Sequence, residues 1–275
     1  SNRGTRGGKA GAVSAAVAGG VNADAAKRAV KSIAGDASKQ SAERIKEEVE
    51  TMLAISGRHP NLPTIHAVYE QKASHIIHIV TDCYSGGKLL DAVGRRKRFV
   101  VADWEAIAVQ LLGAVSFLHT VGVVHRDIKP DNVMLKREWR EGAAPQLVLV
   151  DFGSATFARG GKKLSGFEGT KFFAAPEVYH SKPYGARSDV WSVGVCLMVL
   201  LTGLPPNDRI QDVWRAMLDG KLPILPKSTP GRFTELMTSL LVSDPDKRPS
   251  AAEALAGAAW LLPAGGIPGR ARPGV

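Results

Sequence analysis

Two stretches decide the fold: Val124-His125-Arg126-Asp127-Ile128-Lys129-Pro130-Asp131-Asn132-Val133 and Leu147-Val148-Leu149-Val150-Asp151-Phe152-Gly153. In the first, a lysine follows Asp127 by two residues and an asparagine follows that lysine by three. In the second, Asp151 comes directly after an apolar, β-branched run that is typical of a buried strand. Transfer of a phosphoryl group from a metal-bound nucleotide to a hydroxyl needs such groups: an oxygen base, a cation and two oxygen ligands for metal.

This ordered pair of motifs resembles the signature of protein kinases. The resemblance implies that Asp127 accepts the proton of the attacking hydroxyl and that Lys129 places a positive charge on the transferred phosphate. It also implies that Asn132 and Asp151 bind Mg²⁺ and that ATP is the nucleotide. Taken alone, Asp-Phe-Gly is more often a turn after a strand, and His-Arg-Asp is more often a solvated loop. Their order, followed by Ala175-Pro176-Glu177, argues against both alternatives.

Fold class and domain organisation follow from the same resemblance. It implies an α+β, two-lobed protein kinase fold, in which a small antiparallel β-sheet lobe carries one key helix and a larger lobe is mainly helical. We expect an ATP-binding lobe over residues 1–82, a catalytic lobe over 83–262 and a flexible tail over 263–275. The resemblance covers the chain from Ala29 to Trp260.

The composition is that of a globular chain with ample length for a large core: 275 residues, 44% hydrophobic and 23% charged. The two cysteines, Cys83 and Cys196, lie far apart in the sequence, so we expect no disulfide framework and a reducing, cytoplasmic location. We expect a monomer with no membrane span, because no apolar run free of charges and turn signals reaches about 18 residues. The run Val190–Leu201 is too short and predicts a buried helix.

The net charge of +10 raises the alternative of a nucleic-acid-binding module. The basic residues are spread along the chain, with one short cluster at residues 95–98, and neither a recognition motif nor interleaved aromatic residues accompany them. We therefore interpret the excess charge as a solvated surface that also suits ATP, and nucleic acid is not an expected partner.

The first twenty residues are rich in glycine and alanine and contain no acidic residue. They admit two interpretations, a targeting segment or an atypical glycine-rich loop that approaches phosphate through free backbone N–H groups. In the second, residues 6–13 resemble the kinase loop, with Gly8, Gly11 and Val13 in register and Arg6 in place of its first glycine.

Apolar and polar side chains alternate along Ala29–Ile33, which predicts a strand. The segment also matches the Val-Ala-Ile-Lys element of kinases, with Lys31 at the position of its lysine. By this resemblance, Lys31 contacts the α- and β-phosphates of ATP. Residues 41–55 have apolar side chains at the spacing of one helical face, which predicts a helix. Within it Glu48, seventeen residues after Lys31, fits the ion-pair partner of that lysine, and Glu47 is its exposed competitor.

The adenine site is also assigned by resemblance. Thr81 corresponds to the gatekeeper, and the Asp82 carbonyl and the Tyr84 amide of the following hinge are expected to pair with the adenine edge. Ala29 and Met134 complete the predicted nucleotide-binding residues.

Two features of residues 151–177 concern the substrate and activation. Thr170 resembles the threonine that bridges the catalytic aspartate and lysine in serine/threonine kinases, so protein serine and threonine hydroxyls are the expected substrates. Gly166 stands where the family commonly has a phosphothreonine that meets Arg126, and Glu168 supplies a fixed negative charge nearby. We therefore expect activity without phosphorylation of this segment.

Four further positions take roles by resemblance. Asp189 is expected to anchor the backbone of the first signature stretch, and Arg248 is expected to pair with the glutamate of Ala-Pro-Glu. Lys88 stands where related kinases have a glutamate that binds an arginine upstream of the target hydroxyl, whereas Asp131 keeps the second acidic contact.

Within the family, the chain resembles the calcium/calmodulin-dependent group, especially plant calcium-dependent kinases and phosphoenolpyruvate carboxylase kinases. No Asp-x-Asp-x-Asp-Gly loop is present, so we expect no calcium binding through an EF-hand in this chain. The expected function is transfer of the γ-phosphate of Mg-ATP to protein hydroxyls. The alternative is a pseudokinase that binds partners without transfer; Arg6 favours it, and the complete set of charge-handling groups opposes it.

Overall fold

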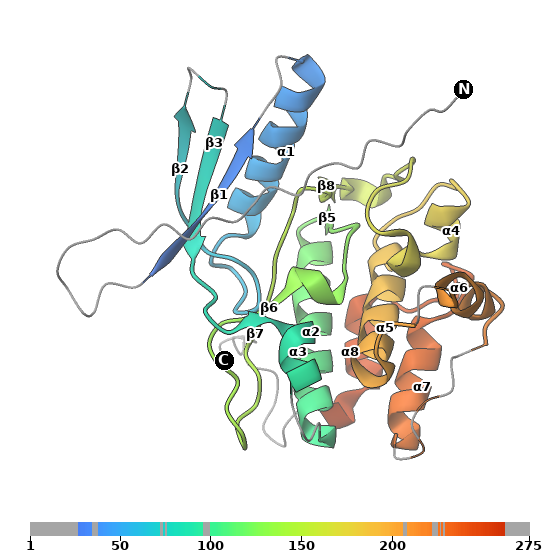
Figure 1. Cartoon of the computed structure of the whole chain (residues 1–275). Helices are drawn as coiled ribbons and strands as arrows, with labels where there is room; N and C mark the ends of the chain where they lie inside the picture. The colour runs from blue at the N-terminus through green and yellow to red at the C-terminus, as the bar shows by residue number, and fades with distance from the viewer. Residues whose placement is uncertain are drawn as a thin grey trace, which may run out of the picture.

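The computed structural model describes residues 27–34, 38–71, 74, 76–95, 100–205, 208–221, 225, 227 and 229–261. The predicted glycine-rich loop, with Gly8, Gly11 and Val13, and the predicted tail over 263–275 lie outside these residues. Within them, a small sheet with one helix is joined to a larger, mainly helical part (Figure 1). This is the α+β, two-lobed arrangement that the sequence predicts.

The small lobe is an antiparallel sheet of three strands in the order β1-β3-β2, with one helix beside it (Figure 1). Its elements are β1 (Arg28–Ala34), α1 (Lys39–Ile55), β2 (Ile65–Gln71) and β3 (Ile76–Asp82). The predicted strand and helix here are confirmed. Helix α1 begins two residues before the predicted start because the Ser38 hydroxyl caps it, accepting a hydrogen bond from the Ser41 N–H at 3.2 Å.

The large lobe is built around a buried helix. The helices described in this lobe are α2 (Leu89–Arg95), α3 (Val101–Thr120), α4 (Pro176–Tyr179), α5 (Arg187–Thr202), α6 (Ile210–Leu218), α7 (Gly231–Leu240) and α8 (Ala251–Gly257). Every residue of α5 from Ser188 to Leu200 is buried, as expected of a helix that is apolar on all sides. Helix α3 packs against α5 and α8, so these helices form the centre of the core (Figure 1).

Helix α3 bears on the expectation that no segment spans a membrane. Among the described helices, it alone is long and apolar enough to cross a membrane by length and composition, with a mean hydropathy of 1.4. Half of that apolar window is buried inside the protein, and the helix also carries Asp103 and Glu105. Its apolar side chains, including Trp104, Ile107 and Leu112, are fully buried in the core, which accounts for its composition.

Short strand pairs position the two signature stretches. The pairs are β5 (Val123–Val124) with β8 (Thr156–Phe157), and β6 (Val133–Leu135) with both β4 (Gly87–Lys88) and β7 (Leu147–Leu149). The first stretch therefore runs between β5 and β6, and the second leaves β7. The Val150 N–H donates to the Asn132 carbonyl at 2.8 Å, which places Asp151 beside the end of the first stretch. Single 3-10 turns occur at Pro130–Asn132, Arg159–Gly161, Lys171–Phe173 and Ala259–Leu261.

Candidate active site

A lysine between two carboxylates joins the lobes. Nζ of Lys31 on β1 lies 2.7 Å from Oε1 of Glu48 on α1 and 2.8 Å from Oδ1 of Asp151. Burial would lower the pKa of Lys31, but the two carboxylates outweigh burial and the pKa is raised. Burial would likewise raise the pKa of Asp151, and the charge of Lys31 overcomes it and lowers that pKa. Lys31 and Asp151 are therefore held in the charge states that binding of phosphate and metal requires.

The structure also separates the two candidate glutamates on α1. The carboxylate of Glu47 accepts a hydrogen bond from the Thr156 hydroxyl on β8, whereas Glu48 faces β1. Consecutive residues on a helix point about 100° apart, so the two side chains cannot serve the same partner. Helix α1 thus contacts the small sheet through one glutamate and the segment after Asp151 through the other.

Asp127 is held by three neighbouring side chains. Nζ of Lys129 lies 2.7 Å from Oδ2 of Asp127 and also donates to the Thr170 hydroxyl at 2.8 Å. That hydroxyl donates to Oδ1 of Asp127 at 2.8 Å, and Nδ2 of Asn132 donates to Oδ2 at 3.1 Å. The predicted aspartate, lysine and threonine are therefore brought together, and the carboxylate is fixed in one orientation. A fixed acceptor of this kind suits general-base chemistry.

The buried carboxylate of Asp189, on α5, holds the backbone that carries this group. It accepts hydrogen bonds from the N–H groups of His125 and Arg126, both at 2.9 Å, and its Oδ2 lies 2.9 Å from Nε2 of His119. Burial would raise the pKa of Asp189, but the bond to His119 and the charges nearby lower it. These bonds stabilise Arg126 at a φ of 65°, a conformation that non-glycine residues rarely adopt.

His125 links the two signature stretches. Its Nδ1 accepts from the Asp127 N–H at 3.3 Å, and its Nε2 lies 3.2 Å from the Val150 carbonyl, so the neutral ring with a proton on Nε2 satisfies both partners. Complete burial lowers the pKa of His125, which keeps it neutral. Its ring also packs against Phe152, with 4.9 Å between ring centroids. The base at Asp127 and the carboxylate at Asp151 are thereby tied to one side chain.

Residues 151–177, called the activation segment from here on, pass close to Asp127 at Gly169. This residue has a φ of +91°, and a Cβ there would lie 2.2 Å from the Arg126 carbonyl oxygen and 3.2 Å from Oδ1 of Asp127. No side chain fits without displacing the backbone, so glycine is required. The close approach is what delivers the Thr170 hydroxyl to Asp127.

Glu168, the fixed negative charge expected near Arg126, pairs with a different arginine. Oε1 of Glu168 lies 2.7 Å from Nη2 of Arg44 on α1, while Nε of Arg126 donates to the Ser154 carbonyl. Arg44 is not distinguished by its sequence, because a charged residue on an exposed helix face is usually only solvated. The segment is thus connected to α1 by an ion pair between two unmodified side chains.

Asp151 and Asn132 are suited to hold a metal ion. Nδ2 of Asn132 donates to the Asp127 carbonyl at 2.8 Å and to its side chain, which leaves the amide oxygen as a potential ligand. Among the described residues, no group of three or more His, Cys, Asp or Glu side chains could hold a metal. One carboxylate and one amide nevertheless fit Mg²⁺, which commonly takes one or two carboxylates together with substrate phosphates.

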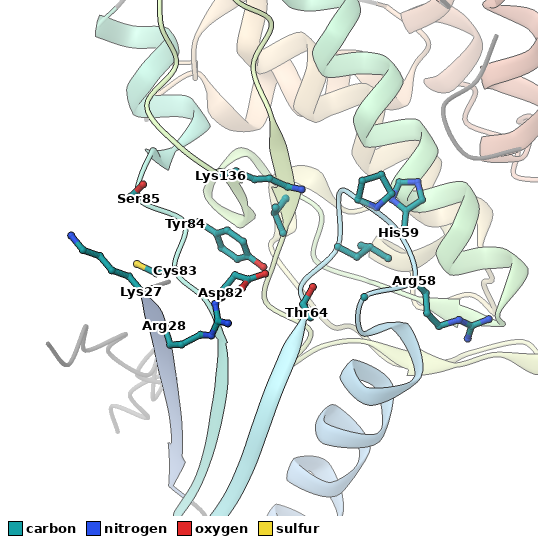
Figure 2. A pocket seen from close by; sticks show the side chains of 14 residues that line it. Lys27, Arg28, Arg58, His59, Thr64, Asp82, Cys83, Tyr84, Ser85 and Lys136 are labelled. Atoms are coloured by element: carbon teal, nitrogen blue, oxygen red, sulfur yellow. Dashed lines mark hydrogen bonds and ion pairs between the residues drawn. The ribbon is translucent and has the colours of Figure 1, made fainter. Parts of the chain in front are cut away.

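The other predicted nucleotide-binding residues lie on the strands around the hinge. Ala29 on β1 pairs with Thr81 on β3, next to the hinge. Met134 is half-buried on β6, opposite Lys88 on β4. The side chains of the hinge residues Asp82 and Tyr84 line a cavity that Ala29, Thr81 and Met134 do not line (Figure 2).

A buried ion pair holds the end of the activation segment at Glu177. Arg248 makes two hydrogen bonds to Glu177, of 2.8 and 3.0 Å. Its side chain is fully buried and also donates to three backbone carbonyls, those of Arg187, Val242 and Ser243. The ion pair that the sequence predicts between Arg248 and Glu177 is therefore present.

The sequence is similar to those of known proteins. Residues 7–260 match the protein kinase domain. The chain is 33% identical over 218 residues to calcium-dependent protein kinase 10 of Oryza sativa subsp. japonica, 39% over 186 residues to serine/threonine-protein kinase PEPKR2 of Arabidopsis thaliana and 35% over 223 residues to CDPK-related kinase 5 of Arabidopsis thaliana. The matches cover 78%, 67% and 78% of this chain, but 35%, 37% and 35% of the relatives. Because the family match extends over most of the sequence, the chain belongs to the protein kinase domain family.

Proposed function

We propose that this chain is the catalytic domain of an ATP-dependent protein serine/threonine kinase. The observation that carries the proposal is the joint arrangement of Asp127, Lys129 and Thr170 beside the Lys31–Glu48 pair. A domain that only binds partners would not need a fixed base next to a paired lysine. The names of the three relatives, all protein kinases, support the same activity.

In this arrangement each side chain of the site has a separate role in phosphoryl transfer. Lys31, positioned by Glu48, contacts the α- and β-phosphates, and Asn132 and Asp151 hold Mg²⁺, which neutralises charge on the phosphates. Asp127 orients the substrate hydroxyl and accepts its proton. Lys129 provides positive charge next to the base, where negative charge develops on the transferred group. The free cysteines at 83 and 196 support our proposal of a reducing, cytoplasmic setting.

The test is incorporation of labelled phosphate from Mg-ATP into a mixed library of serine, threonine and tyrosine peptides. We expect label on serine and threonine, and we expect both Lys31→Met and Asp151→Asn to reduce kcat/KM by about 10²-fold or more. Thermal melting of each variant separates loss of activity from loss of folding. Lys46→Met, which removes an exposed lysine from α1, is the matched control. Wild-type activity in either site variant, or no label at all in the wild type, would contradict the proposal.

The Arg44–Glu168 ion pair should replace part of the role of a phosphorylated activation segment. Because both charges are present without modification, phosphatase treatment and Ser165→Ala should leave kcat unchanged. Glu168→Gln should lower kcat by about two- to fivefold, since a partly exposed ion pair contributes about 0.2–1 kcal/mol. Steady-state kinetics of each variant measure the effect.

Two further variants test that pairing. Glu50→Gln, on the exposed surface of α1, is the control and should have no effect. Exchanging the charges, with Arg44→Glu and Glu168→Arg together, should recover the activity that either single change loses. If phosphatase abolished activity, or the exchange recovered nothing, the ion pair would not have this role.

Lys88 and Asp131 should weaken selection for an upstream arginine. The sequence places one repulsive and one attractive charge at these positions, and the structure pairs them directly, with 2.8 Å between Nζ and Oδ1. The bond to Asp131 raises the pKa of Lys88, so the lysine stays charged. An arginine of a substrate would have to displace Lys88 from the carboxylate that attracts it.

Peptide arrays that report kcat/KM can measure this preference. We expect a preference for upstream arginine of less than about fivefold in the wild type. Lys88→Glu should strengthen it, and Asp131→Ala should shift selection toward acidic peptides. The exposed Lys247, changed to glutamate, is the control. A strong arginine requirement that Lys88→Glu leaves unaltered would show that Lys88 does not contact the substrate.

A further inference from the structure

A cavity of about 690 Å³ lies against the hinge. Asp82 and Tyr84, whose backbone groups are expected to pair with adenine, line it with their side chains, whereas Lys31, Asp127 and Asp151 do not line it. Its walls are the hinge residues 82–85, the start of β1 at residues 27–28 and the turn that follows α1 at residues 57–60 (Figure 2). Lys136 and Val148, on either side of the excursion between β6 and β7, complete it. Its volume is within the range of about 300–1,000 Å³ that is typical of small-molecule sites.

The charged groups of this cavity are mainly cations. Lys27, Arg28, Arg58 and Lys136 line it, and Asp82 is the single lining carboxylate. Asp82 is already engaged, since its Oδ1 lies 2.9 Å from Nη1 of Arg28 and 2.8 Å from Nε2 of His66. Within the part of the chain that the structure describes, no carboxylate pairs with the other three cations. The cavity therefore carries an excess of positive charge that its one carboxylate, Asp82, does not neutralise.

The imidazole of His59 is affected by the positive charge of this cavity. Its imidazole lines the cavity, and its Nδ1 accepts the Asn61 N–H at 3.2 Å, so the neutral ring keeps its proton on Nε2. Burial and the positive charge of Lys136 both lower the pKa of His59. An anion in the cavity would relieve the positive potential that this shift reflects.

The cavity also has an apolar wall with one buried donor. Leu62 and Val148 line this wall and are buried, and the ring of Tyr84 lines the same cavity (Figure 2). The Tyr84 hydroxyl is buried near the backbone of Thr64 and makes no hydrogen bond of normal geometry with the described residues. Burial and the neighbouring Asp82 raise the pKa of Tyr84 to about 12, so the hydroxyl remains a donor. A buried donor without a partner favours a ligand with an acceptor.

We propose that this cavity is a binding site for a small aromatic anion, such as an aryl carboxylate, sulfonate or phosphate. Its flat body packs on Leu62, Val148 and the Tyr84 ring. Its negative group is bound by Lys136, the positive charge of Lys27 on the other side of Tyr84 adds to the attraction, and an acceptor atom takes the hydrogen bond of the Tyr84 hydroxyl (Figure 2). The proposal is independent of phosphoryl transfer, because none of these side chains belongs to the base or the metal site.

The first experiment uses 8-anilino-1-naphthalenesulfonate, whose fluorescence rises in an apolar site, as the probe on the full chain. We expect saturable binding that excess Mg-ATP does not displace. Lys27→Glu and Lys136→Glu should each weaken it by about two- to thirtyfold, since reversal replaces attraction by repulsion. Lys247→Glu, an equally large change of charge on an exposed residue, should have no effect. N-phenyl-1-naphthylamine, which lacks the sulfonate, should bind less tightly.

Displacement by Mg-ATP, equal binding of the uncharged probe or an equal loss in the Lys247 variant would each overturn the proposal. Tyr84→Phe should weaken binding of the anionic probe with little change in melting temperature, because the lost hydroxyl makes no hydrogen bond of normal geometry with the described residues. Melting curves of all variants ensure that the comparison is made between folded proteins.

Cys83 provides a second measurement that needs no fluorescence. It lines the cavity, whereas Cys196, the other cysteine of the chain, is fully buried. We expect the anionic disulfide 5,5′-dithiobis(2-nitrobenzoate) to react with Cys83 faster than uncharged 2,2′-dithiodipyridine, after division by their rates with free cysteine. Lys27→Glu should remove this advantage, and the naphthalenesulfonate should protect Cys83. Unchanged rate ratios in the variant, or no protection, would contradict a positive binding site here.

Discussion

Asp127→Asn should lower kcat for phosphoryl transfer by about 10²–10⁴-fold, the contribution typical of a positioned general base. Asparagine has nearly the same shape, and its oxygen can still accept from Lys129 or Thr170, but it cannot take up the proton of the substrate hydroxyl. We therefore expect a large fall in kcat with a smaller change in the KM for ATP. Steady-state kinetics against one serine peptide, with circular dichroism of the same sample, measure both quantities.

The matched control is the aspartate four residues further along. Asp131 is exposed and pairs with Lys88, so Asp131→Asn should leave kcat nearly unchanged for a peptide without basic residues. Turnover close to that of the wild type in Asp127→Asn, or the same loss in both variants, would assign the base elsewhere.

Arg248→Met should destabilise the fold by about 3–5 kcal/mol, because it leaves the carboxylate of Glu177 buried without its partner. Both side chains are almost fully buried, with exposed fractions of 0% and 4%. Arg248 also donates to three backbone carbonyls, and methionine cannot supply these hydrogen bonds. The melting temperature should fall by roughly 5–15 °C. Urea denaturation monitored by tryptophan fluorescence gives the change in the free energy of unfolding.

Two comparisons isolate the buried pair. Lys247→Met removes the adjacent, exposed cation and should change the free energy of unfolding by less than about 0.5 kcal/mol. The double variant Glu177→Leu with Arg248→Met should not recover the stability, because the three carbonyls stay without donors. If Arg248→Met cost no more than Lys247→Met, or if the double variant were as stable as the wild type, burial of the pair would not be what stabilises this region.

The sequence by itself determined the family and the principal charged groups. The spacings from Asp127 to Asn132 and to Asp151 specify a loop and a strand end that belong together, and the seventeen residues between Lys31 and Glu48 are enough for a strand and part of a helix. Such motifs can be recognised in a sequence because the chemistry restricts both the residue type and the local conformation. Asp189 and Arg248 were identified for the same reason, as residues within short motifs.

Only the tertiary structure decided which partner each remaining charge meets. The sequence could not select Arg44 for Glu168, since the two lie 124 residues apart and both belong to exposed surfaces. It did not show that Lys88 and Asp131 neutralise each other, nor that α3 owes its apolar length to the core. The cavity beside the hinge is formed by residues from five separate places in the chain. Contacts of this kind depend on how separate elements pack, and long, exposed side chains have many possible partners, so their local sequence does not specify them.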